Sequence, residues 1–369
     1  MRIAVPTEVK PQEYRVAITP VGVDELTRAG HQVFVQSRAG VGSSIADEDY
    51  RAAGATIVEG AEATWASGEM VLKVKEPIAA EYGFLREDLL LFTYLHLAAD
   101  RPQTEALLDA GTTAIAYETV RLPSGMLPLL YPMSEVVGCL APLAGAQALM
   151  KAHGGRGVLL GGVAGVANAK VVILGGGVAG QNAANVAVGM CADVTIIDKD
   201  LAKVREVSWR WGNRIQALAS NAMTIREQVL AADLVIGTVL VPGSKAPKLV
   251  TNEMVAQMKP GSVLVDVAID QGGCFEDSHP TTHEHPTFPV HDSVFYCVAN
   301  MPGAVPHTST WALTNATLPY VEKLAALGWR QAIETDAALR LGLNVQDERL
   351  RHEGVARAFS DLPYQEYAG

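Results

Sequence analysis

The hydrophobic positions in the first third of the chain fall into short runs separated by amphipathic stretches. β-Branched and other apolar residues dominate segments 2–8, 32–37, 70–76, 89–95 and 113–118. Between the first two, VGVDELTRAG has the apolar spacing of a helix and ends at Gly30, a residue suited to a left-handed helix cap. This alternation of strands with helices is typical of βαβ units and predicts a parallel sheet.

A second α/β region begins near Lys170. Residues 170–200 predict a strand, a glycine turn, a helix and another strand. Further strands are expected at 233–240, 262–269 and 295–300, each bounded by polar residues, Gly or Pro. From residue 308 onward the pattern is helical, and no returning strand is predicted. The predicted fold class is therefore α/β.

Composition narrows the classes of protein to which the chain can belong. Its 369 residues suggest about two domains, and 49% hydrophobic residues are enough for a large core. With 40 acidic and 29 basic residues the net charge is −11, which argues against a nucleic-acid partner. No apolar run reaches the ~18 residues of a membrane span, so no membrane partner is expected.

The cysteines and the first residues bear on the compartment. The four cysteines lie far apart and form no CxxC pair, which argues against a disulfide framework or a structural zinc site. The opening MRIAVPTEVK has neither the basic segment nor the long apolar stretch of a signal peptide. We therefore expect a cytoplasmic protein with reduced thiols.

A glycine motif marks the start of the second α/β region. Gly175, Gly177 and Gly180 form GxGxxG directly after a predicted strand and at the start of a predicted helix. Such glycines permit a tight turn, and the helix N-terminus offers amide donors to a pyrophosphate. Asp198 ends the next strand about 20 residues on, where a carboxylate binds ribose hydroxyls and repels a 2′-phosphate. The pattern predicts a dinucleotide site that favours NAD over NADP, with the strictness of that preference left open.

Several candidates for chemistry fall where predicted strands end. Lys75, His96 and Asp270 each close a strand pattern, and the carboxyl ends of parallel strands face the ligand crevice of such folds. A lone His96 is more often a cap or core histidine than a catalytic one. Arg15 either binds a substrate carboxylate or is an ordinary surface residue, and Asp266, within its strand, is expected to be structural.

Two further features are expected to be loops. The HxxxHxH pattern at 279–285 has spacing compatible with a metal, but no carboxylate or cysteine completes a recognised ligand set. The segment GGVAGV at 161–166 is rich in glycine without an intact strand-to-helix frame. No metal is therefore expected.

Motifs spread over the chain resemble those of the alanine dehydrogenases. They are PTEVKPQEYRVAITPVGVDELTRAGH at 6–31, KVKEP at 73–77, YLHLAAD at 94–100, MSEVVG at 133–138, LGGGVAGQNAA at 174–184, AIDQGG at 268–273 and VANMPGAVP at 298–306. The resemblance runs from residue 1 to about residue 345. Soluble subunits of proton-translocating transhydrogenases share the first and the glycine-rich motifs, so those motifs alone would not decide between the two.

This resemblance implies the reversible, NAD-dependent oxidative deamination of L-alanine to pyruvate and ammonia. It implies that Arg15 pairs with the substrate carboxylate and that Lys75 contacts the carboxylate or the carbonyl oxygen of pyruvate. His96 and Asp270 become the acid/base residues, and Asn300 helps to hold substrate and nicotinamide. Alanine and NAD are expected to meet in an interdomain cleft that closes during turnover.

The resemblance also implies a fold and an assembly. It implies two Rossmann-like domains with parallel sheets, in which an NAD-binding domain of residues 129–306 is inserted into a discontinuous substrate domain of residues 1–128 and 307–369. A homo-oligomer, specifically a homohexamer, is expected. Beyond the glycines, the implied cofactor contacts are Ser134, Val178, Ala179, Asp198, Lys203, Ser220, Val239, Leu240, Val267, Ala268, Ile269, Asp270, Val298, Ala299, Asn300 and Met301.

Two positions depart from the family pattern. Ala164 stands where proline is common, which should relax a loop, and His279 stands where an arginine often reaches the cofactor. Two other functions stay open. One is a nucleotide-binding subunit of a proton-translocating transhydrogenase, and the other is a soluble dehydrogenase for another amino or hydroxy acid.

Overall fold

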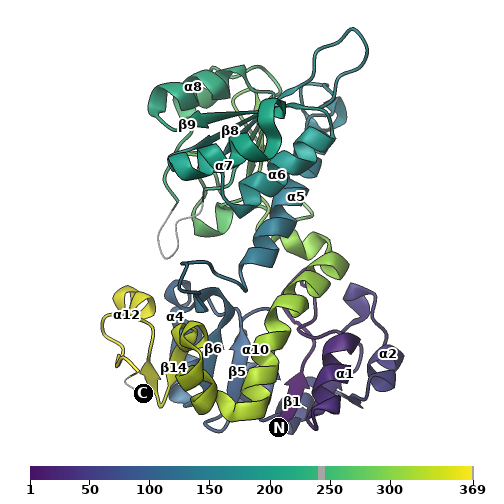
Figure 1. The fold of residues 1–369 in the computed structure, drawn as a ribbon, viewed down its shortest axis with the longest axis vertical. Coiled ribbons are helices and arrows are strands. Elements are labelled where there is room, and N and C mark those ends of the chain that lie inside the picture. Colours follow the sequence, from purple (N-terminus) through teal and green to yellow (C-terminus); the bar gives the residue numbers. More distant parts are fainter. Residues whose placement is uncertain (240–245, 368–369) are drawn as a thin grey trace. The chain divides into compact units, whose positions relative to one another are not determined.

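The computed structural model describes residues 1–239 and 246–367 and divides the chain into two compact units (Figure 1). Unit 1 comprises Met1–Met133 and Val305–Gly369, and unit 2 comprises Ser134–Ala304. The sequence predicts domain breaks after residues 128 and 306, whereas the units divide after residues 133 and 304. In each unit, helices cover the faces of one twisted sheet.

The sheet of unit 1 has the strand order β15-β14-β6-β5-β4-β1-β2-β3. The six strands from β3 to β6 are parallel and mostly buried, as expected of a sheet covered on both faces. Its strands are β1 (Arg2–Val5), β2 (Gln32–Gln36), β3 (Thr56–Val58), β4 (Met70–Leu72), β5 (Leu90–Thr93), β6 (Thr113–Ala116), β14 (Leu343–Gln346) and β15 (Arg349–Leu350).

The helices of unit 1 begin at residues that favour helix starts. Pro20 opens one helix and Asp100 caps another by accepting a bond from the Gln103 amide, at 3.1 Å. The helices are α1 (Pro20–Arg28), α2 (Asp47–Ala52), α3 (Ala61–Ser67), α4 (Arg101–Asp109), α10 (Pro306–Thr335), α11 (Ala337–Leu341) and α12 (Glu353–Ala358). Helix α5 (Tyr131–Ala148) begins in unit 1 and continues into unit 2.

The end of the chain corrects one prediction. No strand was expected after residue 308, but β14 pairs antiparallel with β6 and β15 pairs antiparallel with β14. Polar residues hide this strand pattern in the sequence, because Asn344 and Gln346 are buried alongside Leu343 and Val345. The buried side-chain amide of Asn344 has a hydrogen-bond partner, since it donates to the hydroxyl of Thr119 at 2.7 Å.

Unit 2 contains the sheet β12-β13-β11-β10-β7-β8-β9. Both faces of β7 are apolar: Val171 and Ile173 join one core cluster, while Val172 and Leu174 join the other. The strands are β7 (Lys170–Leu174), β8 (Asp193–Asp198), β9 (Ile215–Ala219), β10 (Leu234–Gly237), β11 (Val263–Asp266), β12 (Thr287–Val290) and β13 (Ser293–Tyr296). The helices are α6 (Val178–Gly189), α7 (Leu201–Trp211), α8 (Ala222–Ala231) and α9 (Asn252–Val255).

The two sheets share one topology. Reading from β3 and from β9, the six parallel strands of each follow the sequence order 3-2-1-4-5-6 of a doubly wound fold. The predicted α/β class with two Rossmann-like domains is confirmed. Such sheets bind ligands beyond the carboxyl ends of their strands, where the strand order reverses. That switch point lies between β1 and β4 in unit 1 and between β7 and β10 in unit 2.

Among the described residues, none of the helices is both long enough and apolar enough to cross a membrane.

Candidate active site

The glycine turn of unit 2 joins β7 to α6, at the switch point of that sheet. Gly175 has φ +107°, a conformation that favours glycine, and a Cβ on Gly180 would lie 1.8 Å from the Gly175 carbonyl oxygen. Gly177 differs, because a Cβ there would meet no atom of residues 1–239 or 246–367 within 4 Å. Two glycines are thus needed by the fold itself, whereas Gly177 leaves space beside the N-terminus of α6. This geometry fits a pyrophosphate.

Asp198, at the end of β8, is tied to the same turn. Its carboxylate accepts bonds from the Gly176 amide at 2.6 Å and from the Asp200 amide at 2.8 Å. Thr238, which follows β10, donates its hydroxyl to the carbonyls of Leu174 and Gly175 at 2.9 and 3.0 Å. The sequence gives no sign of this second brace, because Thr238 reaches the turn only through the pairing of β10 with β7.

The other predicted cofactor contacts follow strands or occupy nearby helices. Ser220 follows β9, Val239 follows β10, and Lys203 lies on α7. Leu240 lies outside the described residues. On the remaining elements, Ser134 is in α5, Val178 and Ala179 open α6, the segment Val267, Ala268, Ile269 and Asp270 follows β11, and the segment Val298, Ala299, Asn300 and Met301 follows β13.

Helix α5 packs closely on α6. A Cβ on Gly138 would lie 2.4 Å from the Ala179 carbonyl oxygen, so only glycine permits this approach without a shift. The signal for this contact is the glycine within MSEVVG, which the sequence alone does not connect to α6.

The loop after β11 holds Asp270 on its surface. Asp270 does not end the strand as predicted: β11 stops at Asp266, and Asp270 is exposed in a short 3-10 turn, Ile269–Gln271. Asp266 is fully buried and accepts bonds from the amides of Ala268 and Cys274 at 3.1 and 2.9 Å and from the Ser278 hydroxyl at 2.5 Å. Asp266 is structural, as predicted, and it shapes the loop that carries Asp270.

Arg15 is buried in unit 1, not a surface residue. Only 2% of it is exposed, and its Nε and Nη2 donate to the two carboxylate oxygens of Glu13 at 2.7 and 2.6 Å. Its Nη1 lies 3.0 Å from the sulfur of Met133. Burial by itself would lower the pKa of Arg15, but Glu13 raises it, so the guanidinium stays charged. A fixed, planar cation of this kind suits a carboxylate ligand.

The two lysines after β4 have different environments. Lys73 has no exposed surface, and its ammonium lies 3.2 Å from Glu8 and 2.9 Å from Glu81. Burial opposes its charge, but the two glutamates raise the pKa of Lys73 above its usual value. Lys75 is half-buried and lies further past the strand end. Lys73 is therefore part of a buried group of charges with Glu8 and Glu81. Lys75 remains the candidate for binding a ligand, as its position suggested.

His96 lies three residues beyond the end of β5, not at the strand end itself. It adopts φ +51°, an uncommon left-handed conformation for a residue other than glycine, and its side chain is 47% exposed. Its ring stacks on Tyr94 at 5.9 Å between centroids and 8° between planes. The Tyr94 hydroxyl donates to the Leu129 carbonyl at 2.5 Å, so the stacking partner is itself fixed. His96 is thus an accessible imidazole on an ordered turn.

Asn300 has the other unusual backbone among the predicted residues. Its φ is +57°, and it directly precedes the 3-10 turn Met301–Ala304. Asparagine tolerates this conformation better than most residues, and such conformations cluster at functional sites.

The histidine-rich loop at 279–285 shows no metal site. Within the described part of the chain, no group of three or more His, Cys, Asp or Glu side chains is arranged to hold a metal. His279 packs on Phe288 with ring centroids 3.7 Å apart. Ala164 lies in the predicted loop, where Val163 and Val166 form an isolated bridge.

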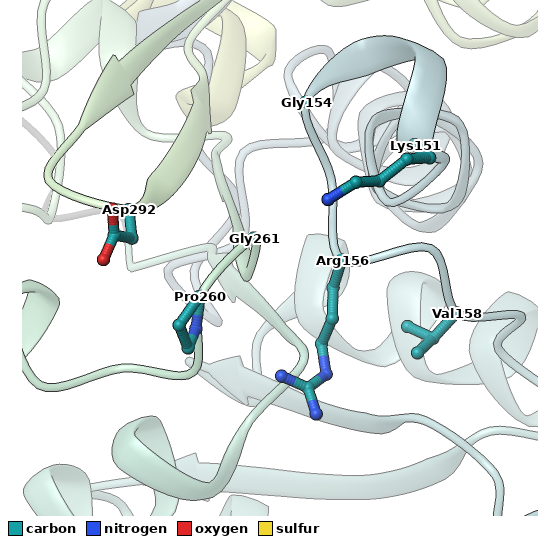
Figure 2. A pocket seen from close by; sticks show the side chains of 7 residues that line it. All are labelled: Lys151, Gly154, Arg156, Val158, Pro260, Gly261 and Asp292. Carbon is teal, nitrogen blue, oxygen red and sulfur yellow. The ribbon is translucent and has the colours of Figure 1, made fainter.

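A hollow in unit 2 lies at the other edge of the sheet (Figure 2). Gly261 precedes β11 and Asp292 precedes β13, so the hollow faces the amino ends of the strands. Arg156, in its wall, pairs with Asp233 at 3.1 Å. This hollow is separate from the glycine turn, which lies at the carboxyl ends.

Comparison with known proteins places the chain in a family. The N-terminal domain model of "Alanine dehydrogenase/PNT" matches residues 4–137, and its C-terminal domain model matches residues 141–353. The chain belongs to the alanine dehydrogenase/PNT family. This membership confirms the resemblance seen in the motifs and implies a nucleotide cofactor.

Individual relatives within the family differ in their similarity to the chain. It is 60% identical over 368 residues to the alanine dehydrogenase of Mycolicibacterium smegmatis, covering 100% of this chain and 99% of that one. A solved L-alanine dehydrogenase matches with a TM-score of 0.95 and 55% identity, covering 98% and 99% of the two chains. The transhydrogenase from Sinorhizobium meliloti matches with a TM-score of 0.80 and 26% identity, covering 95% and 99%.

Proposed function

We propose that this chain is an NAD-dependent L-alanine dehydrogenase that interconverts L-alanine with pyruvate and ammonia. The observation that carries the proposal is the set of side chains at the switch point of unit 1. Lys75 follows β4 and His96 follows β5, so neighbouring strands of one sheet bring them to the same edge. Arg15, in the segment between β1 and α1, lies close enough for its charge to act on Tyr94, the ring that stacks on His96. Full-length identity to alanine dehydrogenases of 60% and 55% supports the choice of substrate.

The residues of unit 2 fit NAD. Gly177 and the N-terminus of α6 would receive the pyrophosphate, and the Asp198 carboxylate would meet the adenosine ribose and disfavour a 2′-phosphate. The other contacts proposed are those at Ser134, Lys203, Ser220, Val239 and the segments after β11 and β13. When bound, NAD supplies a nicotinamide ring that accepts a hydride from the alanine Cα.

The polar side chains have separate proposed tasks. Arg15 and Lys75 hold the substrate carboxylate, and in the reverse direction Lys75 also contacts the carbonyl oxygen of pyruvate. His96 removes the amine proton, because the amine must be neutral before Cα is oxidised to the imine. Asp270 handles the water that adds to the imine, and proton transfer through His96 and Asp270 then expels ammonia. Asn300 helps to orient the substrate.

Substitution of the two acid/base residues tests these roles. His96→Ala and Asp270→Asn should each lower turnover with L-alanine by at least about a hundredfold, because each removes a positioned proton-transfer group. Both variants should still bind NADH, as measured by fluorescence titration. His153→Ala and Asp292→Asn, at the other edge of the unit 2 sheet, are matched controls. Near-normal turnover in both test variants would contradict the assignment.

A transhydrogenase subunit is the second candidate, because the family includes that activity and the structure from Sinorhizobium meliloti matches at 26% identity. The purified chain alone should then bind the nucleotide but leave L-alanine unreacted. Homohexameric assembly also remains a prediction, which light scattering of the purified chain would check.

A further inference from the structure

Two glutamates, the buried Glu8 and the half-buried Glu118, accept hydrogen bonds from the backbone of the turns that carry Lys75 and His96. Glu118, two residues after β6, accepts a bond from the His96 amide at 2.6 Å. The same carboxylate accepts the Leu95 amide at 3.2 Å, so two consecutive N–H groups point at one side chain. The His96 ring nitrogen Nδ1 lies 4.0 Å away, beyond hydrogen-bond distance, so Glu118 binds the turn through its backbone.

Glu8 holds Lys75 in the same way. It lies three residues after β1 and accepts the Val74 amide at 2.6 Å and the Lys75 amide at 3.3 Å. Lys73, 3.2 Å from Glu8, keeps a positive charge beside this carboxylate. At both turns, a carboxylate that follows a neighbouring strand receives two successive amides just where the sheet pairing ends.

These bonds have a specific consequence for the two side chains. Residues beyond a strand end lose their ladder partners, and their amides need another acceptor if the turn is to be fixed. Charged acceptors form stronger bonds than neutral ones. His96 also adopts a left-handed conformation that is unfavourable without support. The carboxylates therefore position the imidazole and the ammonium through hydrogen bonds to the backbone.

The His96 turn has support on its other side as well. Helix α12 packs against the 3-10 turn Leu97–Ala99, which directly follows His96. Arg101, at the start of α4, binds Asp361 near the end of the chain with both terminal nitrogens. The C-terminal segment thus packs against the residues that follow His96, whereas Glu118 binds the amides of Leu95 and His96.

We propose that Glu118 and Glu8 are positioning residues of the active site, acting through the backbone on His96 and Lys75. This inference rests on the proposed function, because positioning is measured in alanine turnover. Replacing an ordinary structural carboxylate lowers stability, whereas replacing either of these two should change the kinetic constants. Loss of Glu118 should impair the chemical step more than folding, because a small displacement of an acid/base group is costly for the reaction.

The experiment compares Glu118→Ala, Glu118→Gln and Asp336→Ala. Asp336 is the matched control: it also accepts two successive amides, those of Ala338 and Leu339, at 3.0 and 3.1 Å within unit 1. Glu118→Gln keeps an acceptor oxygen but loses the charge. The measurements are kcat and KM for L-alanine, the Kd for NADH, thermal unfolding, and amide hydrogen exchange of the peptide that contains residues 94–98.

We expect Glu118→Ala to lower kcat/KM by about thirtyfold or more, mostly in kcat, with the Kd for NADH within about twofold of the unchanged protein. Glu118→Gln should recover most of this loss. Exchange of the Leu95 and His96 amides should rise at least about tenfold in Glu118→Ala and stay unchanged in Asp336→Ala. Asp336→Ala should lose stability while its kinetics stay within about twofold. Glu8→Ala should instead raise KM, because it removes the acceptor of the Val74 and Lys75 amides and Lys75 binds the substrate in the proposed function.

Other results would overturn the inference. Glu118→Ala within about threefold of the unchanged kcat/KM would do so, as would an equal kinetic loss in Asp336→Ala. If Glu118→Ala does not fold, Glu118→Asp carries the same expectation, because its shorter carboxylate cannot reach both amides. An unsubstituted protein that is inactive on L-alanine would refute the proposed function, and the exchange measurement would then still decide whether Glu118 fixes the turn.

Discussion

The switch points of the two sheets share a strand order but contain opposite kinds of residue. In unit 2, glycines and the hydroxyl of Thr238 surround β7 and β10 and leave backbone amides to meet a ligand. In unit 1, buried charges follow β1 and β4 instead. Topology sets where such folds bind ligands, and the residues just past the strands decide the chemistry. In the proposed function these residues fit an extended dinucleotide in unit 2 and a small carboxylate in unit 1.

Replacing Lys73 should produce the largest effect on unit 1. Lys73→Met leaves Glu8 and Glu81 buried without their cation, which should lower the free energy of unfolding by about 3–5 kcal/mol. Denaturant titration measures this loss. Lys10→Met, at a more exposed ion pair with Glu76, should cost about 1 kcal/mol or less.

The sign of the pH dependence sharpens this prediction. Burial raises the pKa of Glu8 even with Lys73 present, so removing the cation should raise it further. As the pH falls, Glu8 takes up a proton and its uncompensated charge disappears. The deficit of Lys73→Met should therefore shrink toward acid pH. A deficit that grows as the pH falls would contradict the buried-charge explanation.

Two glycines of unit 2 should separate folding from ligand binding. Gly180→Ala places a Cβ against the Gly175 carbonyl and should cost about 1–3 kcal/mol of stability. Gly177→Ala adds a Cβ that meets no atom in the described part of the chain, so its melting temperature should stay unchanged while its affinity for NADH falls at least about tenfold, or about 1.4 kcal/mol. Fluorescence titration and thermal unfolding give both values. Unchanged affinity in Gly177→Ala would show that the pyrophosphate does not approach there.

Charge at the end of β8 should set the choice of nucleotide. Asp198→Asn keeps an oxygen for the Gly176 amide but removes the negative charge, so the NAD-to-NADP ratio of kcat/KM should fall about tenfold. Asp200→Asn is the control, since Asp200 caps α7 by accepting the Ala202 amide. If both variants keep the ratio of the unsubstituted protein, Asp198 does not select the nucleotide.

The smallest expected change is in thiol labelling, which reports on unit 2 alone because all four cysteines lie there. Cys191 is exposed, whereas Cys274 and Cys297 are buried, and burial raises the pKa of Cys297 to about 12. A maleimide at pH 8 should label Cys191 and spare the two buried thiols. Lys73→Met should leave this protection unchanged, because its damage is confined to unit 1. Faster labelling of Cys274 in that variant would show that the units do not unfold independently.

Local pattern predicted much of this molecule. The strand, turn and helix around Gly175 were predictable because each glycine and Asp198 lie within one short, periodic segment. The strand β14 was not, since its buried Asn344 and Gln346 break the apolar pattern and its pairing with β6 spans most of the chain. The two-residue strand β15 pairs with β14 at the edge of the sheet, so it depends on that strand. His96 and Asp270 were placed near the right strands but a few residues too close to their ends.

The roles of the buried charged residues that support the turns could not be predicted from the sequence, for a related reason. Glu118 and Glu8 matter because other strands bring the amides of His96 and Lys75 to them. The burial of Lys73 likewise depends on Glu81, which joins it only in the folded chain. Side chains that act on a distant segment leave no local pattern, whereas those that cap or turn their own segment do.

The most direct test of the central claim is NADH formation by the purified protein with L-alanine. D-Alanine, lactate, saccharopine and glycine would be assayed in parallel, each with NAD and with NADP. The account predicts turnover mainly with L-alanine and NAD. Nucleotide binding without turnover of any of these substrates would contradict it and favour a subunit that works only with a partner.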